Sequence, residues 1–221
     1  MNILTKIASL TLAVTCAGLV VTASRAAETV GVNQETKTEA RKDSSSQGKA
    51  KVGAPAPAIS LKDAEGNAWS LSDAKGKVVV LQWMNPECPV CRRVSSDGTT
   101  ANTLKAVREA FPDAVYVGIN SSSSRPSSFE ASKGYMANHK LDMPLLIDTD
   151  GAVSKQYGAR TTPHCFVIDA NGVIVYSGAI DDSPSGGAKT NYVVDAVNAL
   201  KAGKPVTPSE TKSYGCAVKN K

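Results

Sequence analysis

Aromatic residues are scarce in this chain of 221 residues, which contains three Phe, two Trp and six Tyr. The formal charge of +5 is small, and the basic residues are spread along the chain. A surface that binds nucleic-acid strands combines a basic groove with aromatic side chains on which bases stack. No segment has that combination, so we expect no nucleic-acid partner.

Long apolar runs are also missing beyond residue 30, where none approaches the roughly 20 residues needed to cross a bilayer. This excludes a membrane protein with several spans. Hydrophobic residues still make up 42% of the chain and charged residues 20%, so a buried core is feasible. The length suits one domain of ordinary size, or two small ones.

The first 26 residues have the three-part pattern of a secretory signal peptide. Lys6 precedes an apolar segment over residues 7–21, and Ser24-Arg25-Ala26 offers small residues for cleavage. An uncleaved N-terminal anchor is the alternative. Cleavage after residue 26 removes Cys16 and leaves four of the five cysteines (5 − 1 = 4) in an export compartment, where disulfides persist. We expect the mature protein to be periplasmic or secreted.

Three further segments follow the signal peptide. Residues 27–50 contain no aromatic residue and only two Val among the larger aliphatics, which predicts a flexible linker. Residues 51–205 form the expected folded domain, and residues 206–221 a C-terminal tail.

Within the domain, short apolar runs alternate with amphipathic ones, which predicts an α/β sandwich with a mixed sheet. Residues 77–83 read as a central strand buried on both faces. The other expected strands are 58–61 and 68–71 as an N-terminal hairpin, 114–119, 144–147, and 165–169 with 173–177 as an antiparallel pair. The expected helices are 91–111, 127–139, 152–157 and 189–201.

Cys88-Pro89-Val90-Cys91 follows the central strand and opens a helix. A helix N-terminus stabilises a thiolate, the reactive form of cysteine. Two intervening residues place the second sulfur one turn further on, within reach of a disulfide. No His follows Cys91, which removes the haem-attachment motif, and no second cysteine pair completes a four-ligand zinc site.

A second motif lies downstream, where Thr162-Pro163 precedes an apolar strand and a cis bond is plausible. Together with CxxC at a strand-to-helix junction and the segment Phe166-Val167-Ile168-Asp169, it resembles the thioredoxin-like superfamily. The opening residues 52–57 resemble its redoxin branch, which includes thiol peroxidases and exported thiol–disulfide oxidoreductases. The resemblance covers residues 52–219.

This resemblance implies a three-layer sandwich and assigns roles to three residues. Cys88 would be the exposed nucleophile, Cys91 the resolving thiol, and Pro163 the cis-proline of a loop that faces them. Thr162, Pro163 and His164 would line the groove for a partner chain.

The sequence departs from its relatives at several positions. Gln82 replaces the buried acid that thioredoxins use as a proton relay. Peroxiredoxins have Pro seven residues before the attacking Cys, where this chain has Leu81, and Thr or Ser three residues before it, where this chain has Asn85. They also have an activating Arg where this chain has Pro163. These departures weaken a peroxidase interpretation more than an oxidoreductase one.

The roles of three further residues stay open. His164 could stabilise the Cys88 thiolate, bind a metal or face solvent. Cys165 opens an apolar strand, which favours a buried inert thiol. Cys216 could be an additional resolving thiol or could pair with Cys165.

We therefore expect an exported thiol–disulfide oxidoreductase that acts through Cys88 and Cys91 on thiol- or disulfide-containing protein partners. A membrane-bound redox partner is a further candidate, and we expect no cofactor and no metal. One alternative is a peroxiredoxin-like thiol peroxidase. Another is a Cu(I)-delivery module with Cys88, Cys91 and His164 as ligands, since two thiolates and an imidazole form a soft ligand set.

Overall fold

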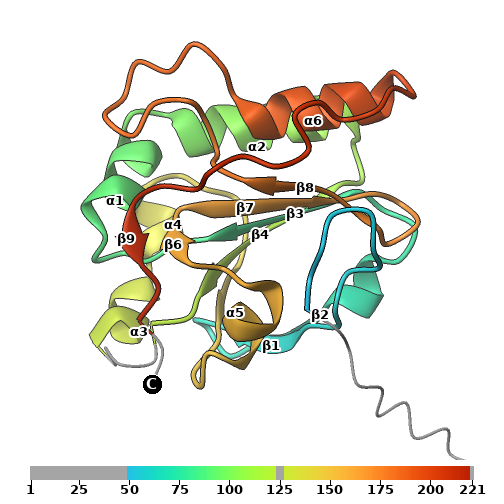
Figure 1. The fold of residues 1–221 in the computed structure, drawn as a ribbon. Coiled ribbons are helices and arrows are strands. Elements are labelled where there is room, and N and C mark those ends of the chain that lie inside the picture. The colour runs from blue at the N-terminus through green and yellow to red at the C-terminus, as the bar shows by residue number, and fades with distance from the viewer. Residues whose placement is uncertain (1–48, 123–126, 220–221) are drawn as a thin grey trace, which may run out of the picture. The chain divides into compact units, whose positions relative to one another are not determined.

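A computed structural model describes residues 49–122 and 127–219, which are built on a seven-stranded sheet in the order β2-β1-β5-β4-β3-β7-β8 (Figure 1). Its strands are β1 (Ser60–Asp63), β2 (Ala68–Ser70), β3 (Val79–Trp83), β4 (Val115–Asn120), β5 (Leu145–Ile147), β7 (His164–Ile168) and β8 (Ile174–Gly178). The helices are η1 (Leu71–Ala74, a 3-10 turn), α1 (Pro89–Ser96), α2 (Thr99–Ala110), α3 (Ser127–Ser132), α4 (Tyr135–Asn138), α5 (Ala152–Tyr157) and α6 (Tyr192–Lys201). A second sheet pairs β6 (Thr161–Thr162) with β9 (Cys216–Ala217).

Strand β3 lies inside the sheet because every one of its five residues is apolar or satisfied by a buried partner, and all five are buried. It runs parallel to β4, with Val79 opposite Val115, and antiparallel to β7, with Val79 opposite Ile168. A parallel neighbour requires a crossover connection, which α1 and α2 provide. The expected mixed sheet is confirmed.

Helices cover both faces of this sheet (Figure 1). On one face, α1, α2 and α6 contribute Val94, Val107 and Val197 to a single apolar cluster. On the other face, α5 contributes Val153 and η1 contributes Ala74 to a second cluster. The expected thioredoxin-like three-layer sandwich is therefore confirmed.

The N-terminal hairpin is also confirmed, although its strands are shifted from the expected ranges. β1 and β2 pair antiparallel with Ser60 opposite Ser70. The Asp63 carboxylate accepts the backbone N–H groups of Glu65 and Asn67 and so fixes the turn between the strands.

Two expected helices are interrupted at glycines. The helix expected at residues 91–111 ends at Ser96, and α2 starts after Gly98, whose φ of +86° is costly for any other residue. The helix expected at 127–139 is likewise split into α3 and α4 by Gly134 at φ +69°. The helical spacing of apolar residues continues across both glycines, so this periodicity alone does not predict the two breaks.

The segment expected as a tail packs on the domain. Ser177 and Glu210 form a bridge beside β8, and β9 pairs with β6. Thr211 lies between these contacts, where its hydroxyl accepts the N–H of Ala179 at 2.9 Å.

The expected signal peptide and nearly all of the expected linker lie outside the described residues. The last linker residue, Ala50, donates its N–H to the carbonyl of Gln156 at 2.9 Å. In the part of the chain that the structure describes, we find no helix with the length and apolar character to traverse a bilayer.

Candidate active site

The CxxC motif lies where the buried strand β3 gives way to α1. Cys88 is the residue that caps the N-terminus of α1, and Pro89 occupies the first helical position, where its missing N–H leaves no donor unpaired. The Asn85 side chain shapes the preceding turn, because its oxygen accepts the N–H of Glu87 at 2.7 Å and its nitrogen donates to Ser122 at 2.8 Å.

The Thr162–Pro163 bond is cis, as expected, and its loop faces the CxxC motif. The Sγ atom of Cys88 lies 3.2 Å from the carbonyl oxygen of Thr162. The structure therefore brings together two motifs that are 74 positions apart in the chain.

Cys216 completes the site from the far end of the chain. Its Sγ atom lies 2.7 Å from that of Cys88, and none of the four described cysteines is in a disulfide. A cavity of about 140 Å³ opens beside the two sulfur atoms, with Glu87 and Lys219 among its lining residues.

This arrangement corrects the expectation that Cys88 is exposed. Only 2% of Cys88 is accessible to solvent, because the C-terminal segment lies over it. The alternative pairing of Cys216 with Cys165 is also wrong for this structure, in which Cys216 contacts Cys88 and Cys165 is buried in β7.

The two cysteines of the motif differ in acidity. A hydrogen bond from the Cys91 thiol is the main cause that lowers the pKa of Cys88 to about 4, against the opposing effect of burial. Further hydrogen bonds from Cys216, the Cys91 backbone and Thr162 act in the same direction. Burial, together with the neighbouring Cys88 sulfur, raises the pKa of Cys91 well above its usual range. Cys88 is therefore the thiolate of the pair near neutral pH.

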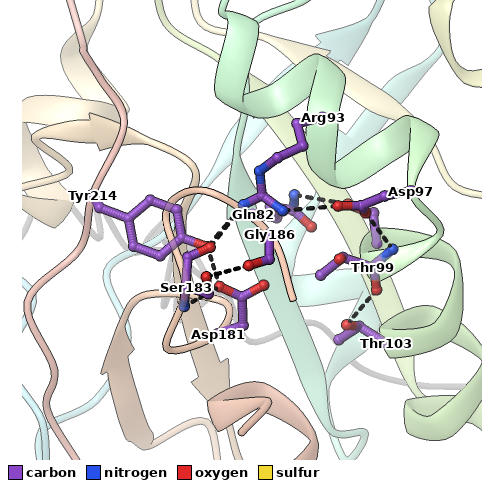
Figure 2. A network of polar contacts seen from close by, with 10 residues as sticks. Gln82, Arg93, Asp97, Thr99, Thr103, Asp181, Ser183, Gly186 and Tyr214 are labelled. Carbon is purple, nitrogen blue, oxygen red and sulfur yellow. Dashed lines mark hydrogen bonds and ion pairs between the residues drawn. The ribbon is translucent and has the colours of Figure 1, made fainter. Parts of the chain in front are cut away.

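The C-terminal segment is held over the site by a polar network (Figure 2). The Tyr214 hydroxyl donates to the buried carboxylate of Asp181 and accepts from the Arg93 guanidinium at 3.5 Å. Arg93 also donates to Asp97 at 2.8 Å and to the carbonyl of Ser183 at 3.0 Å. Arg93 therefore links α1, which carries the motif, to the segment that carries Cys216.

Gly215 lets that segment approach the cis-proline loop. Its φ is +110°, and a Cβ atom at this position would lie 2.1 Å from the carbonyl oxygen of Thr162. Only glycine fits such an approach. The sequence places Arg93 near the CxxC motif and Gly215 beside Cys216, but it contains no signal that Tyr214 and Asp181 belong to the same site.

His164 does not join the cysteines. Its ring stacks on Phe166 with the centroids 4.7 Å apart, and its nitrogens contact the backbone N–H of Arg160 and the hydroxyl of Ser177. Burial lowers the pKa of His164 to about 4, with the Arg160 charge as a second cause.

The Cu(I) ligand set of Cys88, Cys91 and His164 is therefore not assembled. Within residues 49–122 and 127–219, no three side chains of His, Cys, Asp or Glu are grouped so that they could hold a metal ion. His164 instead lines a separate cavity of about 600 Å³ on the other face of the sheet.

Two more positions behave as core residues. Cys165 is fully buried, and its burial raises the pKa of its thiol, as expected for an inert cysteine. Gln82 is buried as well, and its amide accepts from the Tyr116 hydroxyl at 2.8 Å and donates to Thr100 at 3.4 Å. The side chain at position 82 is therefore a neutral amide with both of its polar atoms hydrogen-bonded.

Comparison with protein families decides the affiliation, because the model of the AhpC/TSA family matches residues 52–177, more than half of the chain. The chain belongs to the AhpC/TSA family. That match covers the CxxC motif and the cis-proline loop, and it ends before the segment that carries Cys216.

Relatives of this AhpC/TSA chain include proteins of two kinds. Thiol-disulfide oxidoreductase ResA of Bacillus subtilis is 27% identical over 154 residues, which cover 69% of this chain and 77% of ResA. Peroxiredoxin Q of Sedum lineare is 34% identical over 132 residues, 55% of this chain and 65% of that protein. The crystal structure of an uncharacterized protein from Geobacillus kaustophilus superposes with a TM-score of 0.67 at 28% identity, covering 77% of this chain and 93% of the other.

Proposed function

We propose that this AhpC/TSA chain is an exported thiol–disulfide oxidoreductase. The observation that carries the proposal is the pairing of a Cys88 thiolate, with its pKa lowered to about 4, and a buried Cys91 thiol against the cis-proline loop. The similarity to a thiol–disulfide oxidoreductase over 69% of the chain supports the same reaction class.

The reaction has two exchange steps. First, the Cys88 thiolate attacks a substrate disulfide, a bond forms between Cys88 and one substrate sulfur, and the other sulfur leaves as a thiolate. Second, Cys91 loses its proton and attacks the Cys88 sulfur, so that the Cys88–Cys91 disulfide forms and the second substrate thiolate leaves. The substrate gains two electrons and the protein loses them, and the same steps in reverse oxidise a dithiol.

The substrate groove of this proposal is the surface beside Thr162, Pro163 and Cys88. An extended partner chain can add as a strand to a free strand edge. The edge of β6 is occupied by β9 in this structure, so a partner chain would take the place of β9. We propose thiol- or disulfide-containing protein partners, a membrane-bound one among them. The signal-peptide pattern of residues 1–26 supports export to the periplasm or beyond.

The experiment that tests this function traps the first exchange step. The double variant Cys91→Ala/Cys216→Ala keeps only Cys88 at the site, so a mixed disulfide with a disulfide substrate should accumulate at Cys88. Peptide mapping without reductant identifies the adduct. A double variant that stays unmodified, while a free small thiol reacts with the same substrate, would falsify the mechanism.

A thiol peroxidase is the second candidate, supported by the 34% identity to a peroxiredoxin Q and by the acidic Cys88. In this reaction the thiolate attacks a peroxide oxygen, the O–O bond breaks, the other oxygen leaves as hydroxide, and the sulfur becomes a sulfenic acid. A second thiol then condenses with the sulfenic acid, so that a disulfide forms and water leaves. Peroxiredoxins carry catalytic groups at the positions of Asn85 and Pro163. The absence of those groups here weakens the peroxidase candidate. Stopped-flow oxidation of reduced protein by hydrogen peroxide distinguishes the two, because the oxidoreductase should react no faster than a free thiol.

A further inference from the structure

Three cysteine sulfurs meet at the active site rather than two. Cys88 lies between Cys91, which is fully buried in α1, and Cys216, which is partly exposed on β9. Hydrogen bonds from both neighbours reach the Cys88 sulfur. The oxidoreductase reaction uses Cys88 and Cys91, and it leaves Cys216 without a role.

The backbone around Cys216 is docked as a partner chain would be. Thr162 pairs with Cys216 and Thr161 with Ala217 in an antiparallel register. The next residue continues the pairing, because the N–H of Val218 donates to the carbonyl of Arg160 at 2.9 Å. Residues 216–218 therefore lie as an added strand on the cis-proline loop, and the sulfur of this strand faces Cys88 at 2.7 Å.

We propose that Cys216 is a third redox-active cysteine, which forms an intramolecular disulfide with Cys88. The inference rests on the proposed oxidoreductase function and adds a second partner for the same nucleophile. The strand that carries Cys216 occupies the groove of the substrate and has to leave it when a protein partner binds.

The exchange is balanced within the chain. Starting from the Cys88–Cys91 disulfide, the Cys216 thiolate attacks the Cys88 sulfur, the Cys88–Cys91 bond breaks, and Cys91 leaves with the electron pair and takes up a proton. No electrons enter or leave the protein. The product carries its disulfide at the edge of the cavity beside Cys88 and Lys219, where a partner thiol can reach Cys216 without entering the core.

Cys165 does not compete for this role. It lies opposite Gln82 inside the sheet and is fully buried, so that no movement of the C-terminal segment alone would bring it to Cys88. Cys165→Ala is for this reason the matched control for the loss of a cysteine.

The test adds one equivalent of dithiobis-nitrobenzoate, a chromogenic aromatic disulfide, to a set of reduced cysteine variants and follows the release of thionitrobenzoate. In Cys91→Ala, Cys88 should take up the reagent and Cys216 should then displace it, which releases both thionitrobenzoate anions and leaves a Cys88–Cys216 disulfide in the peptide map. In Cys91→Ala/Cys216→Ala, one anion should be released and the adduct should remain on Cys88. Cys91→Ala/Cys165→Ala should behave as the single variant does. Cys91→Ala/Cys216→Ser should behave as Cys91→Ala/Cys216→Ala does, which would show that the result comes from the missing thiol and not from altered packing.

The outcomes separate the two proposals. If the thionitrobenzoate adduct on Cys88 has the same lifetime in Cys91→Ala and in Cys91→Ala/Cys216→Ala, the role of Cys216 is overturned and the oxidoreductase function is left intact. An unreactive Cys88 in the double variant would overturn the oxidoreductase function itself. A peptide map of oxidised wild-type protein should also contain the Cys88–Cys216 disulfide beside the Cys88–Cys91 disulfide.

Discussion

Removing the hydroxyl of Tyr214 is the smallest substitution that should weaken the docking of the C-terminal segment over Cys88. This hydroxyl donates to the buried carboxylate of Asp181 and accepts from Arg93, and the substitution Tyr214→Phe removes both contacts while the ring stays (Figure 2). The remaining attachments of the segment, at Thr211 and along β9, are unchanged by it.

The expected magnitude follows from the charge of Asp181. A hydrogen bond to a charged group contributes about 2 kcal/mol to stability, and losing it leaves the buried carboxylate short of a donor. Because each 1.4 kcal/mol is a factor of ten, the population with an undocked segment should rise about 30-fold. Cys88 is 2% exposed when the segment is docked, so its modification reports that population.

The assay is alkylation of reduced protein by iodoacetamide, with the Cys88 peptide quantified by mass spectrometry. We expect the rate at Cys88 to rise about 30-fold in Tyr214→Phe, in proportion to the opening constant. Tyr157→Phe is the matched control, because the Tyr157 hydroxyl is also buried and donates to Pro57 at 2.6 Å, but on the opposite face of the sheet. An unchanged rate in Tyr214→Phe, or an equal rise in both variants, would show that the segment does not control access to Cys88.

Three further predictions concern the same region. The thiolate absorbance of reduced protein should persist near neutral pH, disappear on acidification with a midpoint of about 4, and be absent from Cys88→Ser; a midpoint in the ordinary thiol range would contradict the hydrogen bonding described for Cys88. His164, whose folded pKa of about 4 lies below its usual 6.5, should lower the free energy of unfolding by about 3 kcal/mol as the pH falls between these values, since only the unfolded state takes up the proton there. Denaturant titrations of wild type and His164→Gln at the two ends of that range check this. Cys88, whose pKa is also lowered to about 4, adds the same pH dependence to both proteins, so the variant should lose about 3 kcal/mol less than wild type, and an equal loss in both would contradict the prediction. Gly215→Ala should displace β9 and increase the alkylation rate at Cys88 as Tyr214→Phe does, whereas Gly203→Ala, which meets no atom within 4 Å, should leave that rate near wild type.

Local patterns were sufficient for the sheet and for the first two motifs. The run Val79–Trp83 is buried on both faces, and its apolar composition reports that directly. The CxxC motif and Thr162-Pro163 are each defined by adjacent residues, so their placement at strand ends could be predicted without any distance in space.

The sequence left the position of His164 open because β7 is buried throughout, which removes the polar–apolar alternation that normally marks the two faces. Alternation along the backbone still places His164 and Phe166 on one face and Cys165 on the other. Cys88 shares the apolar cluster of Cys165, so the ring of His164 points away from it.

The docking of the C-terminal segment could not be predicted by any local rule. β9 is two residues long, and its partner lies 54 positions away along the chain. Its position depends on contacts between distant segments, namely Tyr214 with Asp181 and Gly215 with Thr162. Such contacts leave no period in the sequence.

The separation of Cys88 and Cys216 along the chain has a consequence for the unfolded state. A Cys88–Cys91 disulfide closes a loop of a few residues, whereas a Cys88–Cys216 disulfide joins residues 128 positions apart. In the chain-entropy account, the longer loop removes more conformational freedom from the unfolded ensemble, and the difference between the two loops amounts to about 3 kcal/mol. The isomer with the long loop should therefore resist denaturant better than the isomer with the short one, although both carry one disulfide and the same number of electrons.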